Sequence, residues 1–350
     1  MPGSAPVKLR CEALWRVYGA EPAKALDEAR RRSREDDARE IARRIKDADH
    51  IAAACDVTFE VPVGETFVIM GLSGSGKSTV LRCLSRLIEA TAGTLEVDGR
   101  SLPALSDREL VELRRHKFGM VFQHFGLMPH QTVLENVEFP LRIQRAPRGE
   151  SRQRALDTLE MVGLSGREDS YPWELSGGQQ QRVGFARSLV TDPEVWLLDE
   201  PFSALDPLIR RQMQDEFLRL QAMLNKAVVF VTHDFLEAVR IGDRIAIMRD
   251  GFVVQTGRAA DLILRPADDY VREFTQDVPR MKVLTALDLC EPRDEASGPV
   301  NRTVSSAASL EDIAAQLAED FEPISVVDQD GAVVGTLRPE PLRRALKTGQ

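Results

Sequence analysis

The sequence has no long apolar run and only four cysteines. No stretch of about 18 consecutive apolar residues occurs among its 350 residues, so we expect the polypeptide not to cross a lipid bilayer. The first residues, MPGSAP, lack the apolar segment of a secretion signal. The cysteines form no Cys-x-x-Cys pair and no metal-ligand spacing, which argues against a disulfide framework and a zinc site; they are Cys11, Cys55, Cys83 and Cys290. A reducing compartment fits best, and any role at a membrane is expected to require a partner protein.

The sequence also lacks an excess of basic residues. It has 46 Lys and Arg against 55 Asp and Glu, a net charge of −9 and an isoelectric point near 5.3. Domains whose main ligand is nucleic acid carry a basic face, so we do not expect nucleic acid as a partner. Apolar residues at 43% and charged residues at 29% are typical of a globular chain, and the length predicts one large domain and a smaller one.

The pattern near the amino terminus changes from alternating to strongly charged. Residues 8–18 alternate apolar and polar types, which predicts a strand. Residues 22–50 are rich in charge with scattered apolar positions, which predicts one or two short helices. We interpret this segment as a solvated surface insertion. Contact of the basic run at residues 30–32 with lipid headgroups is the alternative.

Between residues 57 and 264, short β-branched runs alternate with helical patterns, which predicts an α/β domain on a largely parallel sheet. Three near-continuous apolar runs are expected to be strands buried on both faces, at residues 66–70, 195–198 and 228–231. The pattern begins afresh after residues 277–279. We therefore expect one domain at residues 1–278 and a second at residues 279–350.

A glycine-rich motif follows the first of these strands. Residues 71–78, GLSGSGKS, match the pattern G-x-x-x-x-G-K-S/T between a strand that ends at Met70 and a helix expected through residues 81–88. Glycines let backbone N–H groups converge on phosphate oxygens, and the helix N-terminus adds partial positive charge. Lys77 is expected to contact the outer phosphates, and the Ser78 hydroxyl to bind Mg²⁺. The expected ATP-binding residues of this loop are Gly71, Leu72, Ser73, Gly74, Ser75, Gly76, Lys77, Ser78 and Thr79.

Two carboxylates follow the apolar run at residues 195–198. Open α/β sheets bind ligands at the carboxyl ends of their strands, so Asp199 and Glu200 are both expected beside the nucleotide. Asp199 is expected to hold the metal, directly or through water. Glu200 is the candidate base that polarises the attacking water. A further helix start with exposed backbone donors, LSGGQ at residues 175–179, predicts a second anion site that one nucleotide does not need from the same subunit.

Together these motifs resemble the ATP-binding subunits of ABC transporters across residues 57–265. The resemblance implies a P-loop ATPase with a helical subdomain that carries the signature motif, and a site shared with a second copy. The residues implied to bind the ATP of that second copy are Leu175, Ser176, Gly177, Gly178, Gln179 and Asp206. It also implies that Gln123 touches ATP and the metal, that His233 contacts the γ-phosphate and that Tyr18 stacks on adenine. The implied catalytic residues are Glu200, His233 and Lys77, and the implied metal ligands are Ser78, Gln123 and Asp199.

Within this family, several stretches resemble the ATPases of glycine betaine, proline betaine and choline importers. They are residues 67–79, 127–130, 203–210, 241–248 and 269–271. The resemblance implies three partners, namely membrane permease subunits, a second copy of the chain and, indirectly, a solute-binding protein. It implies a peripheral location on the cytoplasmic face of the bacterial inner membrane. An importer of amino acids or another small solute, a soluble ABC protein and a regulatory adenylate-binding protein are the alternatives.

The carboxyl-terminal segment resembles a single CBS motif. Residues 283–285 open it, a helix is expected near residues 309–320, and strands are expected at residues 324–327 and 332–335. So small a unit buries limited surface, so we expect it to pair with the same unit of the second copy. Sensing of ionic strength or adenine nucleotide and a simple dimerisation role are both open.

Overall fold

The structure, a computed structural model, describes residues 5–32, 37–123, 125–291, 302–317 and 323–338. The chain divides into two compact units, Met1–Val254 and Gln255–Gln350. Within the described ranges, every helix is too short or too polar to span a membrane.

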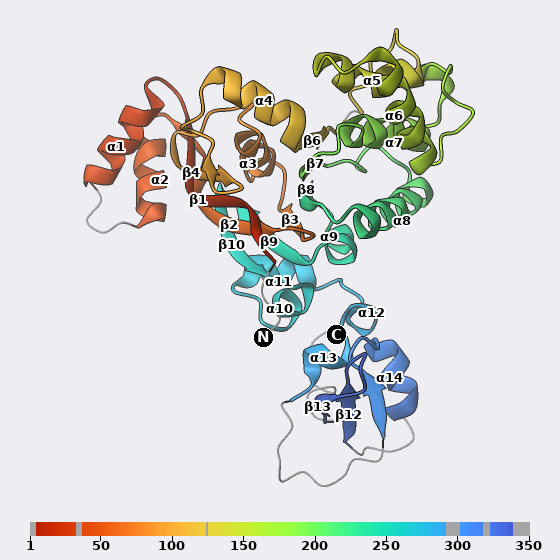
Figure 1. Cartoon of the computed structure of the whole chain (residues 1–350). Helices are drawn as coiled ribbons and strands as arrows, with labels where there is room; N and C mark the ends of the chain where they lie inside the picture. Colours follow the sequence, from red (N-terminus) through yellow and green to blue (C-terminus); the bar gives the residue numbers. More distant parts are fainter. Residues whose placement is uncertain (1–4, 33–36, 124, 292–301, 318–322, 339–350) are drawn as a thin grey trace. The chain divides into compact units, whose positions relative to one another are not determined.

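A six-stranded sheet forms the centre of the first unit (Figure 1). Its strands, in spatial order, are β10 (Phe252–Gly257), β9 (Arg244–Arg249), β3 (Thr66–Met70), β8 (Ala227–Thr232), β7 (Val195–Asp199) and β6 (Phe118–Val121). The pairs β9/β3, β3/β8, β8/β7 and β7/β6 are all parallel. Every residue of β3, β7 and β8 is buried, which confirms the three strands predicted from their continuous apolar runs.

A second, antiparallel sheet lies against the central one. Its strands, in spatial order, are β2 (Ile51–Pro62), β1 (Val7–Tyr18), β4 (Ala92–Val97) and β5 (Arg100–Ser101). The strand predicted at residues 8–18 is therefore confirmed as β1. The main core joins both sheets, and Phe59 of β2 stacks on Phe67 of β3 with ring centroids 4.6 Å apart.

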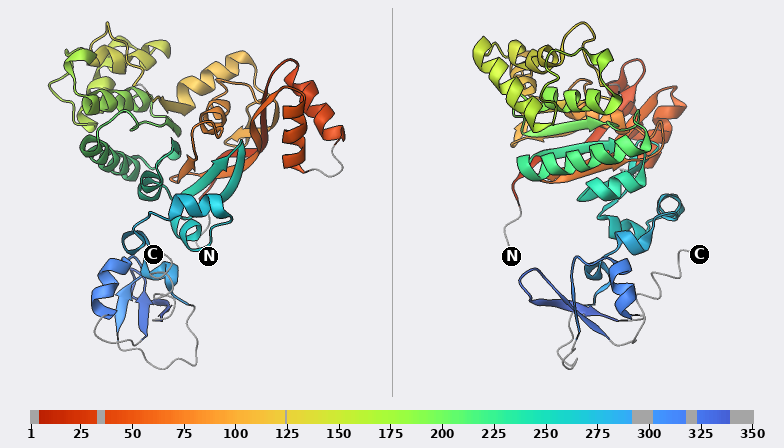
Figure 2. Two further views of the ribbon diagram at one scale, coloured as in Figure 1. Left: turned by 180° about the vertical axis from the view of Figure 1, so that it is seen from behind. Right: turned by 90° about the vertical axis from the view of Figure 1, so that its right-hand side faces the viewer.

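Within the described residues of the first unit, seven α-helices follow β3. They are α3 (Lys77–Leu84), α4 (Asp107–Lys117), α5 (Val133–Ile143), α6 (Arg148–Met161), α7 (Gly177–Leu189), α8 (Pro207–Leu224) and α9 (Phe235–Ile241). The helix predicted through residues 81–88 ends earlier, because Arg86 adopts a left-handed φ of 52° that stops the helical path. Helices α5, α6 and α7 gather on one side of the unit in Figures 1 and 2. They form the helical subdomain. Phe185 of α7 packs edge-on against Trp196 of β7, with ring centroids 5.2 Å apart.

The charged insertion forms two helices, as predicted, α1 (Pro22–Arg32) and α2 (Ala38–Asp47), with residues 33–36 outside the described ranges. Its scattered apolar positions converge in space and are buried against β1 and β2; they are Leu26, Ala29, Ile41 and Ile45. One residue of the basic run also faces inward, because the Arg30 guanidinium lies 5.9 Å from the centroid of the Trp15 ring. The insertion is thus a two-sided element, with a packed inner face and a charged outer face.

The second unit is a small α+β unit. Its sheet has the order β11 (Thr303–Ser305), β12 (Ile324–Val327), β13 (Val333–Leu337), with the first pair parallel and the second antiparallel. Its helices are α10 (Ala259–Leu264), α11 (Asp269–Thr275), α12 (Arg280–Val283), α13 (Ala286–Leu289) and α14 (Leu310–Leu317).

The strands predicted in this segment are confirmed as β12 and β13. The predicted helix at residues 309–320 corresponds to α14 as far as Leu317, and its last three residues lie outside the described ranges. The domain boundary predicted at residues 277–279 lies between α11 and α12, inside the second unit. That boundary stays a prediction.

Candidate nucleotide site

The phosphate loop connects β3 to α3 at the carboxyl edge of the central sheet. Two of its positions require glycine for steric reasons. At Gly71, φ is 155° and a Cβ would collide with the carbonyl oxygen of Met248. At Gly76, φ is 100° and a Cβ would collide with the carbonyl oxygen of Ala53 on β2. The loop therefore lies directly against β2 and the end of β9, which fixes where its N–H groups converge.

Lys77 is almost fully buried at the first position of α3, with 4% of its surface exposed. Its Nζ donates hydrogen bonds to the carbonyl oxygens of Gly71 at 2.9 Å and Leu72 at 3.0 Å, and lies 3.8 Å from Glu200 Oε1. Burial lowers the pKa of the Lys77 ammonium, while the charges of Glu200 and Asp199 oppose that shift. The neighbouring Ser75 hydroxyl is also buried and has no hydrogen-bond partner among the described residues. A polar ligand in this loop would give the Ser75 hydroxyl a partner and would offer Lys77 charged acceptors in place of carbonyl oxygens.

Asp199 ends the buried strand β7 and faces the start of α3. Its Oδ1 accepts a hydrogen bond of 2.8 Å from the Ser78 hydroxyl, and its Oδ2 lies 3.9 Å from Arg82 Nη2. Burial raises the pKa of Asp199, and the hydrogen bond from Ser78 opposes that shift. A hydroxyl and a carboxylate are oxygen donors of the type that Mg²⁺ prefers, so this pair fits that metal.

Glu200 and His233 meet at the adjacent strand ends. The Glu200 N–H donates to the carbonyl oxygen of Val231 at 3.0 Å, which continues the β7/β8 ladder by one residue. Glu200 then turns with a φ of 45°, and its Oε2 lies 2.9 Å from Nδ1 of His233. The Glu200 side chain is 17% exposed and that of His233 is 56% exposed. The two groups predicted to act on the terminal phosphate are thus in contact, although they are 33 positions apart in the sequence.

The predicted residues of the shared site gather at a different place in the first unit. Ser176 caps α7 by accepting a hydrogen bond from the Gln179 N–H at 3.3 Å, and the Gln179 side chain accepts one from the Ser176 N–H at 2.9 Å. A Cβ on Gly178 would lie 2.6 Å from Ile209 of α8, which Asp206 caps. Among the described residues, no hydrogen bond joins residues 175–179 or Asp206 to the phosphate loop. The structure therefore packs the start of α7 against the start of α8, on which Asp206 lies.

Gln123 and Tyr18 lie at strands of different sheets: Gln123 follows β6 of the central sheet, and Tyr18 ends β1 of the antiparallel sheet. Gln123 is exposed and comes two residues after β6 ends at Val121. Since Val121 pairs with Leu198 of the parallel strand β7, Gln123 and Asp199 both come at the carboxyl edge of the central sheet. Tyr18 ends β1 and pairs with Ile51 of β2. Sequence reasoning missed Arg16, whose guanidinium carbon lies 4.3 Å from the centroid of the Tyr18 ring. The signal for it was available, because residues two apart on a strand share a face.

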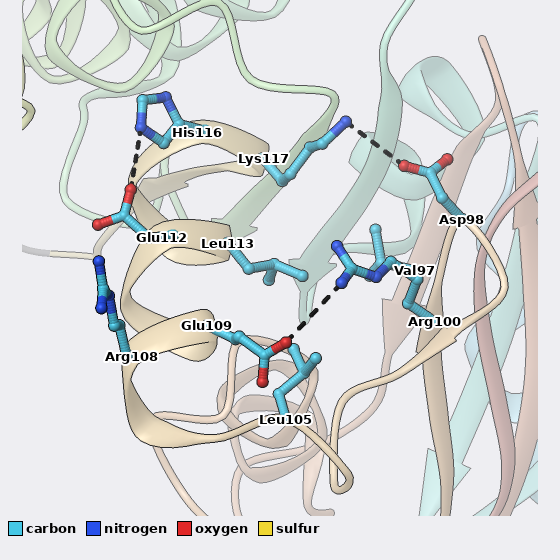
Figure 3. Close-up of a pocket in the computed structure, with 10 residues that line it drawn as sticks. All are labelled: Val97, Asp98, Arg100, Leu105, Arg108, Glu109, Glu112, Leu113, His116 and Lys117. Carbon is cyan, nitrogen blue, oxygen red and sulfur yellow. Dashed lines mark ion pairs between the residues drawn. The ribbon is translucent and has the colours of Figure 1, made fainter.

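A cavity of about 340 Å³ lies away from these residues, between α4 and the β4–β5 hairpin (Figure 3). Two ion pairs cross it, from Arg100 to Glu109 at 4.0 Å and from Lys117 to Asp98 at 3.6 Å. None of the predicted site residues lines this cavity.

Comparison with known proteins agrees with the motifs. The sequence model of the ABC transporter family matches residues 55–203. A trimethylamine N-oxide transport system ATP-binding protein of Pelagibacter ubique is 48% identical over 334 residues, which cover 95% of this chain and 96% of that protein. A glycine betaine/proline betaine transport system ATP-binding protein of Escherichia coli is 42% identical over 352 residues, which cover 98% and 84%.

Solved structures extend the same likeness to the fold. A dimeric ATP-binding cassette, bound to ADP and Pi in a post-hydrolysis state, matches with a TM-score of 0.58 and 34% identity. The match covers 72% of this chain and 98% of that one. This match confirms the predicted P-loop ATPase fold. Because two relatives match over nearly the whole chain, the chain belongs to the family of ABC transporter ATP-binding subunits.

Proposed function

We propose that the chain is the subunit that binds and hydrolyses ATP to power import of a small methylated amine through a membrane permease. The observation that carries the catalytic part is the convergence of Lys77, Asp199, Glu200 and His233 at one edge of the sheet. The solute class is supported by relatives whose names specify trimethylamine N-oxide, glycine betaine and proline betaine. Permease subunits, a solute-binding protein and attachment to the cytoplasmic face of the inner membrane follow from this proposal.

Different residues of one copy bind different parts of Mg·ATP. Backbone N–H groups of residues 71–79 hold the phosphates, and Lys77 exchanges its two carbonyl partners for phosphate oxygens. Ser78, Asp199 and Gln123 would hold Mg²⁺, whose positive charge would stabilise the negative charge that develops on the phosphate oxygens. Tyr18 stacks on adenine.

Glu200 orients and polarises the attacking water, a task generally worth about 10²–10⁴ in rate. Its contact with Nδ1 of His233 leaves the other ring nitrogen of that histidine available for the γ-phosphate. The Ser203 hydroxyl donates to the Glu200 carbonyl oxygen at 3.0 Å and so holds the turn on which Glu200 lies.

The second half of each site is proposed to come from a second copy. Residues 175–179 and Asp206 of that copy would cover the γ-phosphate, since among the described residues no hydrogen bond joins them to the loop of their own copy. Two ATP molecules would then hold two copies together. Loss of the bridging phosphate on hydrolysis would let them separate and return the permease to its other orientation. The dimeric state of the related cassette supports this arrangement.

The test of the catalytic proposal is Glu200→Gln. This variant keeps shape and hydrogen bonding but removes the base, so we expect ATP binding to persist, hydrolysis nearly to vanish and an ATP-dependent dimer to accumulate on size exclusion. Asp215→Asn, on the exposed face of α8, is the matched control and should hydrolyse ATP normally. Continued hydrolysis by Glu200→Gln, with only monomers present, would show that the assignment of Glu200 is wrong.

The solute is tested separately, by transport. The chain would be co-purified with its membrane partners, and ATP-driven uptake into vesicles would be compared for labelled trimethylamine N-oxide, glycine betaine, choline and an amino acid. We expect uptake of one or more of the methylated amines. Uptake of the amino acid alone would favour the alternative importer and leave the ATPase assignment intact.

For the carboxyl-terminal segment, we propose that residues 279–350 form a single CBS-like unit next to an ATPase domain of residues 1–278. The three-stranded sheet with α14 supports this reading of the described part. Pairing with the same unit of the second copy would bury the surface that so small a unit leaves exposed.

A further inference from the structure

Arg16 and Tyr18 form a stacked pair at the end of β1. The guanidinium carbon of Arg16 lies 4.3 Å from the centroid of the Tyr18 ring, well within the distance of about 6 Å at which a cation is attracted to an aromatic face. The guanidinium is held from a second side, because its Nη1 donates a hydrogen bond of 2.9 Å to the carbonyl oxygen of Glu89. Arg16 therefore fixes one face of the tyrosine ring.

This pair lies one strand away from the phosphate loop. Arg16 pairs with Ala54 of β2, and Tyr18 pairs with Ile51. Between these pairs the register shifts, and β2 carries Ala53, whose carbonyl oxygen occupies the space that a Cβ on Gly76 would need. A continuous set of backbone contacts thus connects the phosphate-binding glycine, through β2, to the strand that holds the ring. β-Bulges are frequent beside active sites, where they redirect the backbone.

We propose that Arg16 is a positioning residue for the base of the nucleotide. It covers one face of the Tyr18 ring, restricts the orientation of that ring and leaves the opposite face for a stacked purine. A ring that is already ordered loses less conformational freedom when the ligand binds. The proposal rests on the nucleotide-binding function proposed above. Within that function, Arg16 affects binding of the base and not of the phosphates.

The experiment compares a ligand that has a base with one that has none. The full-length chain is titrated calorimetrically with Mg·ADP and, separately, with Mg·pyrophosphate. For Arg16→Met, we expect ADP affinity to fall about threefold to tenfold, the range that corresponds to loss of one pre-ordered side chain, while pyrophosphate affinity is unchanged. Arg16→Lys should recover part of the ADP affinity, because an ammonium can also lie over the ring.

Two further variants connect the effect to the ring. Tyr18→Ala should weaken ADP binding by at least as much as Arg16→Met, and the double variant should be no weaker than Tyr18→Ala alone, since the two residues act as one unit. Arg10→Met is the matched control. Arg10 lies on the same strand, pairs with Glu60 at 2.8 Å, and its loss should leave ADP affinity unchanged.

Each contrary result has a distinct meaning. Equal losses for ADP and pyrophosphate with Arg16→Met would overturn the inference, because Arg16 would then act on the fold of the loop. Additive losses in the double variant would also overturn it. If Tyr18→Ala leaves ADP affinity unchanged while pyrophosphate still binds, the tyrosine platform is wrong and the phosphate-loop proposal stands. If the unmodified chain binds neither ligand, the proposed function itself fails.

Discussion

Lys77 can donate hydrogen bonds either to groups of the protein or to phosphate oxygens, and in the structure it donates to groups of the protein. Its ammonium donates to two carbonyl oxygens of its own loop and lies near Glu200. Phosphate oxygens would replace neutral acceptors by charged ones, which form hydrogen bonds roughly twice as strong. Lys77 therefore stabilises the nucleotide-bound protein more than the nucleotide-free protein.

We predict that Lys77→Ala weakens ATP binding by about 2–5 kcal/mol, because removal of one partner leaves buried charge on the other unpaired. The measurement is calorimetry with Mg·ATP on the full-length chain. Lys24→Ala, on the exposed end of α1 where Lys24 pairs with Glu21, is the matched control. Unchanged ATP affinity in Lys77→Ala would contradict the assignment of the phosphate loop.

His50 closes the base of the charged insertion. Its Nε2 lies 2.7 Å from the carbonyl oxygen of Ala20, and its Nδ1 lies 2.7 Å from that of Ala48. Only the protonated ring can donate to both oxygens. These two backbone contacts, Ala20 first, together with the charge of Asp49, raise the pKa of His50 above its ordinary 6.5.

Because the pKa of His50 is higher in the folded state, protonated His50 stabilises the fold fully below pH 6.5. This contribution is lost as the pH rises through the raised pKa of the folded state. We predict that the melting temperature of the unmodified chain exceeds that of His50→Gln at low pH, and that the difference shrinks as pH increases. His130→Gln, at an exposed position, should follow the unmodified chain. A difference that grows with pH would have the wrong sign for this interpretation.

At the scale of an element, the phosphate loop offers a matched pair of glycines. Gly76 has a φ of 100° and would place a Cβ against the Ala53 backbone, whereas Gly74 has a φ of 82° and would place one in open space. Both substitutions by alanine cost backbone strain of about 1–3 kcal/mol, and only Gly76→Ala also forces β2 and the loop apart. We predict a larger loss of unfolding free energy for Gly76→Ala, measured by urea denaturation without nucleotide. Equal losses would mean that the contact with β2 does not constrain the loop.

At the scale of the whole molecule, the composite site predicts complementation between two inactive variants. Lys77→Ala disables the phosphate loop of a copy, and Ser176→Arg disables its signature segment. A mixed dimer has one intact site, so we predict that mixing restores hydrolysis, up to about a quarter of the normal rate if copies pair at random. Phosphate release measured across mixing ratios checks this. A mixture as inactive as its components would argue against sites shared between copies.

The amino-acid sequence alone was enough to predict several local features of this protein. The continuous apolar runs of β3, β7 and β8, the phosphate loop after Met70 and the helix start at Ser176 depend on neighbours along the chain. Steric limits on φ and the hydrogen-bond needs of helix ends act over a few residues, so a motif predicts them directly.

Only the tertiary structure decided which of these features meet. The contact of Glu200 with His233 and the burial of Ile41 and Ile45 against β1 and β2 join residues from separate elements. Such contacts depend on the order and register of strands in a sheet, which the packing of the whole core determines and no short stretch of sequence encodes.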